Sequence, residues 1–372
     1  MVRQNLSRKK MKLGMIIITK DIKRFAFILA LFSLISCTRK MNSETVHVTQ
    51  EQVFAGIQVT DYAGRTVCLD KPVERVMVMA DNALVVVKQL GAIDKVIALD
   101  SKTKGYLPLS ILNETNPELQ SLPDVGKTKN PNYEYIISLK PDLILFKGTR
   151  DAADTVQEKT AVPIASVISK EEWDFDLYTT IGKMIGKEKE AKVITHLLKD
   201  KKTELEKALS LLPESQVKKA YIIVQNSSGN LFKTLKNSLS LELAGINNVA
   251  SEANSVDEWG FAEISKEEFL NYDPDFIFLD KPSGSDGIQK KDVLSDSTFK
   301  FCPAVQNQKL YLTHTFSLPK DYVYVILEAY YYAHTAYPDL ITDKLYHDTV
   351  NEIFNAAYGI ENYYESWEES LL

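Results

Sequence analysis

The apolar positions of residues 132–148 predict a short helix followed by a buried strand. Ile136, Ile137 and Leu139 recur at roughly helical spacing. Pro141 then ends the helix, because its ring cannot continue one and biases the preceding residue toward extended geometry. Residues 143–146 are an unbroken apolar run of strand length, which is typical of a parallel strand covered on both faces.

The same helix, proline and strand recur downstream in residues 266–279. A shift of 133 positions lays Pro141 on Pro274 and Glu134 on Glu267. A second similarity supports the repeat, between Leu-Gly-Ala-Ile at 90–93 and Leu-Ala-Gly-Ile at 243–246. The repeat therefore predicts two copies of one α/β lobe.

A long helix predicted over residues 187–212 connects the two copies. Its apolar residues form one stripe and most of its other positions are charged. No Gly or Pro interrupts it before Pro213. A continuous helix would be a stiff linker, whereas an ordinary lobe helix with a separate crossover is the alternative. The expected fold class is α/β, with two similar Rossmann-like lobes bridged by a single long helix.

The expected division of the chain follows from this pattern and from its two ends. It comprises a signal segment at 1–36, a tether at 37–55, an N-terminal lobe at 56–170, a helical linker at 171–213, a C-terminal lobe at 214–340 and a helical tail at 341–372.

One segment of the first copy has no equivalent of the same length in the second. Ile93 and Glu134 are 41 residues apart, whereas Ile246 and Glu267 are 21 apart. The extra residues fall in 101–130, which show little periodicity. A long loop after a parallel strand is more often functional than idle.

The N-terminal segment has the layout of a secretory signal. Basic residues precede an apolar run at 25–35, which is short for a membrane span, and Leu34-Ile35-Ser36-Cys37 follows. A Cys in this context resembles a bacterial lipobox, which implies cleavage before Cys37 and lipid attachment to its sulfur. A weak membrane helix with an incidental Cys is the alternative. We expect an exported protein anchored to a membrane surface through lipid.

The net charge of the protein limits the classes of partner that it is expected to bind. The whole chain has a net charge of −6, and residues 1–36 carry eight basic residues and one acidic residue, so the mature chain is close to −13. Such acidity argues against a nucleic-acid partner.

The sequence contains no recognisable catalytic motif. It has no Gly-rich phosphate loop, no Gly-x-Ser-x-Gly, no His-Glu-x-x-His and no Cys-x-x-Cys. The five histidines are scattered, and only His314 follows a predicted strand of a lobe. We therefore expect no enzyme, with two alternatives open: a binding protein for bare Zn or Mn, and a chelatase-like enzyme on the same scaffold that uses His314.

Glu134 and Glu267 begin equivalent helices of the two copies. Helix capping explains either carboxylate alone. Two equivalent carboxylates also suit a partner with its own twofold repeat, because each would meet a basic residue on one arm of that partner.

The two-copy layout with one helical linker, together with three segments, resembles the substrate-binding proteins of ABC importers for iron–siderophore, haem and cobalamin. The segments are Val-Thr-Asp-Tyr-Ala-Gly-Arg-Thr-Val at 59–67, Pro-Val-Glu-Arg-Val at 72–76, and Asn-Tyr-Glu at 132–134 ending in Lys-Pro-Asp-Leu-Ile at 140–144. The resemblance implies a class III periplasmic binding protein fold, with a ligand held between two lobes. It also implies that Glu134 and Glu267 dock on arginines of a permease dimer, with the adjacent Glu268 still open as the second docking residue.

The resemblance implies a bound iron or cobalt chelate and no resident cofactor. Aromatic side chains suited to its apolar faces are Trp259 or Phe261, with Tyr106 opposite them, and the cationic candidates are Lys147, Arg150 and Lys281. His314 is a candidate axial ligand of a central metal. The scarcity of arginine weakens the expectation of a strongly anionic ligand and leaves a corrinoid, haem or a near-neutral iron complex open. We expect a monomer.

Overall fold

The computed structural model describes residues 56–169, 171–254, 257, 260–281, 287–314 and 321–370, which belong to one compact unit. The predicted signal segment and tether, with Cys37, lie outside the described residues, and so does Trp259. Within the described part of the chain, no helix combines the length and the apolar character that crossing a membrane requires.

The N-terminal lobe is built on a four-stranded parallel sheet with the order β4-β3-β7-β8. The central strands β3 and β7 are apolar and buried at every position, because helices cover both faces of the sheet. The strands are β3 (Val76–Met79), β4 (Val96–Leu99), β7 (Leu143–Phe146) and β8 (Ile164–Ser166). The hairpin of β1 (Ile57–Thr60) and β2 (Thr66–Leu69) opens the lobe, and its helices include α2 (Asp81–Gln89), α5 (Tyr133–Leu139) and α6 (Arg150–Thr160).

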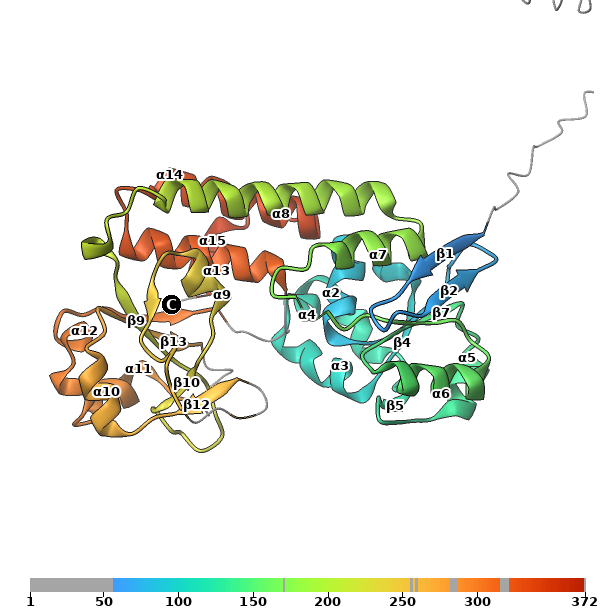
Figure 1. Cartoon of the computed structure of the whole chain (residues 1–372), viewed down its shortest axis with the longest axis horizontal. Coiled ribbons are helices and arrows are strands. Elements are labelled where there is room, and N and C mark those ends of the chain that lie inside the picture. The colour runs from blue at the N-terminus through green and yellow to red at the C-terminus, as the bar shows by residue number, and fades with distance from the viewer. Residues whose placement is uncertain are drawn as a thin grey trace, which may run out of the picture. The chain divides into compact units, whose positions relative to one another are not determined.

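The C-terminal lobe repeats this architecture with a second parallel sheet, in the order β11-β9-β13-β14. Figure 1 labels two of its strands, β9 and β13. Its strands are β9 (Lys219–Ile223), β11 (Asn247–Asn248), β13 (Phe276–Asp280) and β14 (Leu310–Thr313). An antiparallel pair, β10 (Lys233–Leu235) and β12 (Phe261–Glu263), lies beside the sheet. The helices are α9 (Leu239–Leu243), α10 (Lys266–Tyr272), α11 (Lys290–Ser295) and α12 (Pro303–Gln306).

The two lobes match in register as well as in strand order. Leu143 pairs with Val76 in the first sheet, and Phe276, 133 positions after Leu143, pairs with Ala220 in the second. The helices before these strands end alike, because Lys140 and Asp273 both adopt left-handed conformations, with φ of 48° and 46°. The α/β fold of two similar lobes predicted from the sequence is thereby confirmed.

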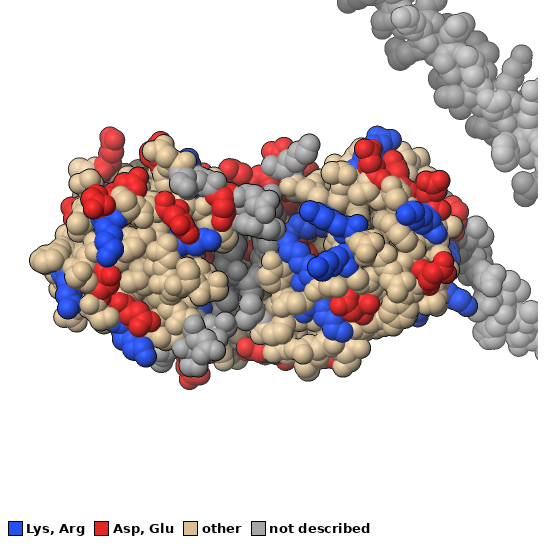
Figure 2. All heavy atoms as spheres, turned by 90° about the horizontal axis from the view of Figure 1, so that it is seen from below, with Lys and Arg blue, Asp and Glu red and all other residues tan. Residues whose placement is uncertain are grey.

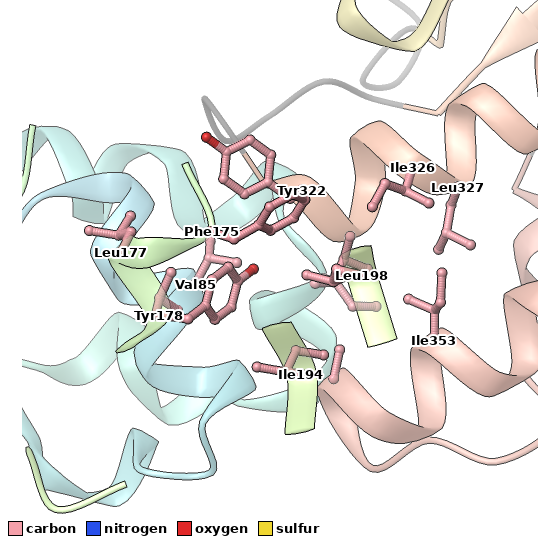
Figure 3. Close-up of a cluster of buried hydrophobic side chains, with 14 of the residues drawn as sticks. Val85, Phe175, Leu177, Tyr178, Ile194, Leu198, Tyr322, Ile326, Leu327 and Ile353 are labelled. Atoms are coloured by element: carbon pink, nitrogen blue, oxygen red, sulfur yellow. The ribbon is translucent and has the colours of Figure 1, made fainter. Parts of the chain in front are cut away.

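The connection between the lobes contains the predicted long helix, α8 (Glu188–Leu209), which follows α7 (Asp176–Ile185). Two helices from the end of the chain, α13 (Tyr322–Ala336) and α14 (Asp343–Tyr358), pack against α8. Side chains from all of these helices and from α2 meet in one buried cluster (Figure 3). The bridge is therefore a packed group of helices and not an isolated rod.

A buried polar network reinforces this bridge. The Gln89 side chain, at the end of α2, donates to Asp321 Oδ1 at 3.0 Å and to the Tyr358 hydroxyl at 2.9 Å. The Tyr178 hydroxyl of α7 donates to Gln89 Oε1 at 2.5 Å. The first lobe is thus joined to the C-terminal helices by hydrogen bonds that are buried away from solvent.

The long segment 101–130 is folded, although the sequence showed little periodicity there. It forms α3 (Ser101–Tyr106), α4 (Ile111–Thr115), two 3-10 turns and a small hairpin of β5 (Gly126–Lys127) and β6 (Asn130–Pro131). Asp100 organises it, because its Oδ1 caps α3 at the Thr103 amide and its Oδ2 accepts from the Thr128 hydroxyl at 2.8 Å. Elements this short leave no periodic signal in a sequence.

Candidate functional site

A cavity of about 760 Å³ lies in the N-terminal lobe, where its parallel strands end. The carboxyl ends of β3, β4 and β7 meet there, which is the usual position of a ligand site in an open α/β sheet. The hairpin at 127–129 and the start of α6 complete the lining. The long segment after β4, which the sequence marked as functional, thus supplies part of the wall.

Four lysines line this one cavity: Lys102, Lys127, Lys129 and Lys147. Together with Asp81 and Asp100, the only other charged residues in the lining, they give it a net charge of +2. The face shown in Figure 2 displays a group of basic side chains on this lobe. A concentration of cations in an otherwise acidic protein favours an anionic ligand at such a place.

Asp81 holds the inner part of the lysine group in place. Its carboxylate is buried, and Oδ1 accepts from Lys147 Nζ at 2.6 Å, while Oδ2 lies 3.7 Å from Lys102 Nζ. Among the described residues, Oδ2 has no hydrogen-bond partner. Because this oxygen is itself shielded from solvent, the Asp81 carboxylate acts as a counter-ion of the two lysines.

Among the predicted ligand residues that the structure describes, Lys147 alone lines this cavity. Arg150 lies just outside it, where its guanidinium reaches the Gly64 carbonyl and lies 3.9 Å from Asp154. Tyr106, at the end of α3, packs half-buried against the core with Lys102 Nζ 5.6 Å from its ring centroid.

Two predicted residues of the C-terminal lobe lie in different surroundings. Phe261 opens β12, pairs with Leu235 and has Lys233 Nζ 5.1 Å from its ring centroid. Lys281 follows β13, and its Nζ donates to the carbonyl of Ser370 at the end of the chain. The Lys281 ammonium is thus hydrogen-bonded to the backbone near the end of the chain.

The expectation that His314 faces a ligand needs correction. The side chain is 5% exposed and stacks on Trp367 of α15 (Tyr364–Glu369). Its Nδ1 contacts Glu328 of α13, and its Nε2 lies 3.1 Å from the Trp367 carbonyl. With both ring nitrogens engaged by the protein, His314 has no nitrogen left for a metal. Trp367, which covers the ring, lies some 50 residues further along the chain, so the sequence around His314 does not indicate its burial.

Glu134 and Glu267 are both exposed in the first turns of short helices, α5 and α10. Glu268 differs from its neighbour, because its carboxylate accepts from the Ser265 amide at 2.8 Å in a capping box. Glu268 therefore has a structural task within its own helix, which leaves Glu267 as the exposed acid equivalent to Glu134.

Lys102, Lys127 and Lys129 are not among the ligand residues predicted from the sequence. The available signal was the density of lysines in the long segment after β4, which the tertiary fold gathers around the strand ends. Among the described residues, no group of three or more His, Cys, Asp or Glu side chains is placed to hold a metal ion.

The folded architecture and the cavity at the strand ends define a solute-binding protein of two α/β lobes, and comparison with known proteins agrees. The model of the periplasmic binding protein family matches residues 81–315, and the chain belongs to that family.

The relatives lie among ABC transporter proteins. The substrate-binding lipoprotein YvrC of Bacillus subtilis is 22% identical, over 77% of this chain and 87% of its own. The Fe(3+)-citrate-binding protein YfmC of the same organism is 28% identical, over 68% and 76%. A periplasmic solute binding protein from Veillonella parvula shares the fold with a TM-score of 0.71 at 20% identity, covering 85% of this chain and 97% of that one. Proteins of this class work with a permease and carry a small molecule.

Proposed function

We propose that this chain is the lipid-anchored binding protein of an ABC importer for an anionic metal chelate whose outer groups are carboxylates, of the ferric citrate class. The chelate binds in the lysine-lined cavity of the N-terminal lobe, and the protein performs no reaction on it. The observation that carries the proposal is the gathering of Lys102, Lys127, Lys129 and Lys147 around one cavity.

The scarcity of arginine argued against a strongly anionic ligand, whereas the four lysines of the cavity favour one. A lysine ammonium is a compact charge on a flexible stem, so several can adjust to carboxylates arranged around a metal. A neutral corrinoid would leave these charges uncompensated on binding, which is costly. The Fe(3+)-citrate-binding relative supports the same class of ligand.

Asp81 positions two of the four lysines for that class of ligand. Its buried carboxylate accepts from Lys147 Nζ and lies 3.7 Å from Lys102 Nζ, so both ammonium groups stay at the cavity wall, where they can meet the chelate's carboxylates.

The test measures ferric citrate affinity by calorimetry on purified protein with the hairpin lysines reversed, as Lys127→Glu with Lys129→Glu. Both side chains are exposed, so the fold should tolerate the change. We expect an affinity loss of about tenfold or more, since two attractive charges become repulsive near the ligand.

The matched control is Lys290→Glu with Lys291→Glu in α11, which makes the same change of net charge in the other lobe. It should leave ferric citrate affinity within about twofold of wild type. Equal losses in the two variants, or preferential binding of cobalamin or haem by the wild-type protein, would refute the proposal.

A further inference from the structure

The end of the chain covers the carboxyl ends of two strands in the C-terminal lobe. Trp367 stacks on His314, which directly follows β14, and the two ring centroids are 3.2 Å apart. The Ser370 carbonyl accepts from Lys281 Nζ, and Lys281 directly follows β13. Both contacts come from residues 363–370, which form the terminal segment.

The strand pairing matches these strand ends to positions in the first lobe. Phe146 of β7 pairs with Ser166 of β8. Leu279 of β13 lies 133 positions after Phe146, and it pairs with Leu312 of β14. The two pairs are therefore equivalent, and so are the residues that follow them along each strand.

Two residues beyond these pairs, the first lobe is open and the second lobe is covered. Gly148 and Ile168 lie two residues beyond the first pair, and both line the lysine-lined cavity. Lys281 and His314 lie two residues beyond the second pair, and both contact the terminal segment. The terminal segment therefore occupies in the second lobe the place that the cavity occupies in the first.

The charges at the two places differ as well. Asp280 lies 133 positions after Lys147, so the second lobe has an acid where the first has a lysine of the cavity. A second acid, Glu328, is buried beside it and contacts His314 Nδ1. An anionic chelate is attracted to the first place and repelled from the second.

The terminal segment is held firmly where it lies. Trp367 is 1% exposed, and its Nε1 donates to the Tyr346 hydroxyl at 2.6 Å. That hydroxyl donates to Glu368 at 2.8 Å, and the Tyr364 amide donates to Asn351 Oδ1 at 2.9 Å. Since Tyr346 and Asn351 both belong to α14, the segment is fastened to the helices that join the lobes.

We propose that the terminal segment is a resident plug that determines the size of chelate the protein accepts. It closes the strand ends of the second lobe, so the chelate is held in the lysine-lined cavity of the first lobe. A bulky chelate that needs the strand ends of both lobes meets the plug and is excluded. The inference rests on the proposed function, which supplies the chelate.

The first experiment fixes the plug in the full-length protein. Lys281→Cys with Ser370→Cys, in a Cys68→Ser background, is joined by a short bismaleimide, and the same protein with both thiols capped by N-ethylmaleimide is the matched control. We expect the two ferric citrate affinities to agree within about twofold, because binding does not require the plug to move. A loss of about tenfold or more on cross-linking would mean that the chelate displaces the segment, which overturns the proposal.

The second experiment loosens the plug with Trp367→Ala and uses Trp367→Phe as the matched control. The probe is a neutral ferric trihydroxamate, which is bulkier than ferric citrate. Its affinity should rise about tenfold or more in the alanine variant and stay near the wild-type value in the phenylalanine variant. A folded alanine variant without this gain refutes the plug, and if that variant does not fold, the cross-linking result decides. If the wild-type protein binds no ferric citrate, the proposed function fails, whereas a gain of hydroxamate binding still supports the plug.

Discussion

Asp142 and Asp275 perform the same structural task in the two lobes. Asp142 Oδ2 accepts from the amide of Arg75 at 2.9 Å, and Asp275 Oδ2 accepts from the amide of Lys219 at 2.8 Å. In return, each aspartate donates its own amide to the carbonyl of that same residue at 2.8 Å. The Pro-Asp step thus fixes the register of the two central strands in each sheet, which explains why the motif occurs twice.

Replacing either aspartate should destabilise the protein by a similar amount. We expect Asp142→Ala and Asp275→Ala each to cost about 1–3 kcal/mol in the free energy of unfolding, because backbone donors lose their acceptor. Asp339→Ala, in an exposed turn, is the control and should stay within about 0.5 kcal/mol of wild type. Chemical denaturation measures all three, and a large loss for only one of the two aspartates would contradict their equivalence.

The stabilising effect of Asp142 should also depend on pH. Burial raises the pKa of this carboxyl, but the Lys71 ammonium and the amides of Glu74 and Arg75 outweigh that effect, so the pKa lies below its usual range. The contribution is therefore present above the unfolded pKa of about 4 and is lost as the pH falls through the folded value. Unfolding of wild type and Asp142→Asn should converge in acid.

Asp280 should produce the opposite pH dependence. Burial and repulsion from Glu328 raise its pKa to about 7, above the value of about 4 in the unfolded chain. The folded state holds this proton more tightly, so stability falls as the pH rises from about 4 to 7. Asp280→Asn should remove that slope and raise the free energy of unfolding at pH 8 by about 1–3 kcal/mol. An unchanged slope would show that another group titrates there.

Trp367 should contribute strongly to stability although it lies near the end of the chain. The side chain is 1% exposed, its Nε1 donates to the Tyr346 hydroxyl at 2.6 Å, and its ring covers His314. Trp367→Ala should cost about 3–5 kcal/mol. Trp367→Phe keeps most of the packing and should cost less than half of that. Thermal unfolding distinguishes them, and a negligible effect of Trp367→Ala would mean that the tail does not hold the C-terminal lobe.

Gly182 permits the close approach of α7 and α8. A Cβ at this position would lie 2.7 Å from the Ala191 Cβ and 2.9 Å from the Lys187 carbonyl oxygen. Since that carbonyl is backbone, the helices must shift to make room, and Gly182→Ala should destabilise the fold by about 1–3 kcal/mol. Gly105→Ala meets no atom within 4 Å and serves as the matched control. Equal melting temperatures for the two variants would contradict this account.

The lipid anchor predicted from residues 34–37 has its own test. Cys37→Ser should release the protein from the membrane fraction, because the sulfur that would carry the lipid is removed. Metabolic labelling with a radioactive fatty acid should mark wild type and not the variant. A labelled Cys37→Ser protein would place the lipid elsewhere.

The sequence alone determined the repeated lobes and the helix between them. The apolar run at 143–146 indicates a buried strand by its length and by the proline before it, and the apolar stripe on an uninterrupted charged segment indicates α8. Both signals lie within a short stretch of sequence. The exposed acids Glu134 and Glu267 followed from the same repeat, without reference to tertiary contacts.

Only the tertiary structure decided the composition of the site. Lys102 lies on α3, Lys127 lies on β5 and Lys147 follows β7. They line one cavity because parallel strands end at one edge of the sheet. The sequence made His314 a candidate metal ligand, but Trp367, on a helix near the end of the chain, stacks on its ring. Long-range proximity leaves no periodic trace in a sequence, so the charge of the cavity and the burial of the histidine emerge only when distant segments pack together.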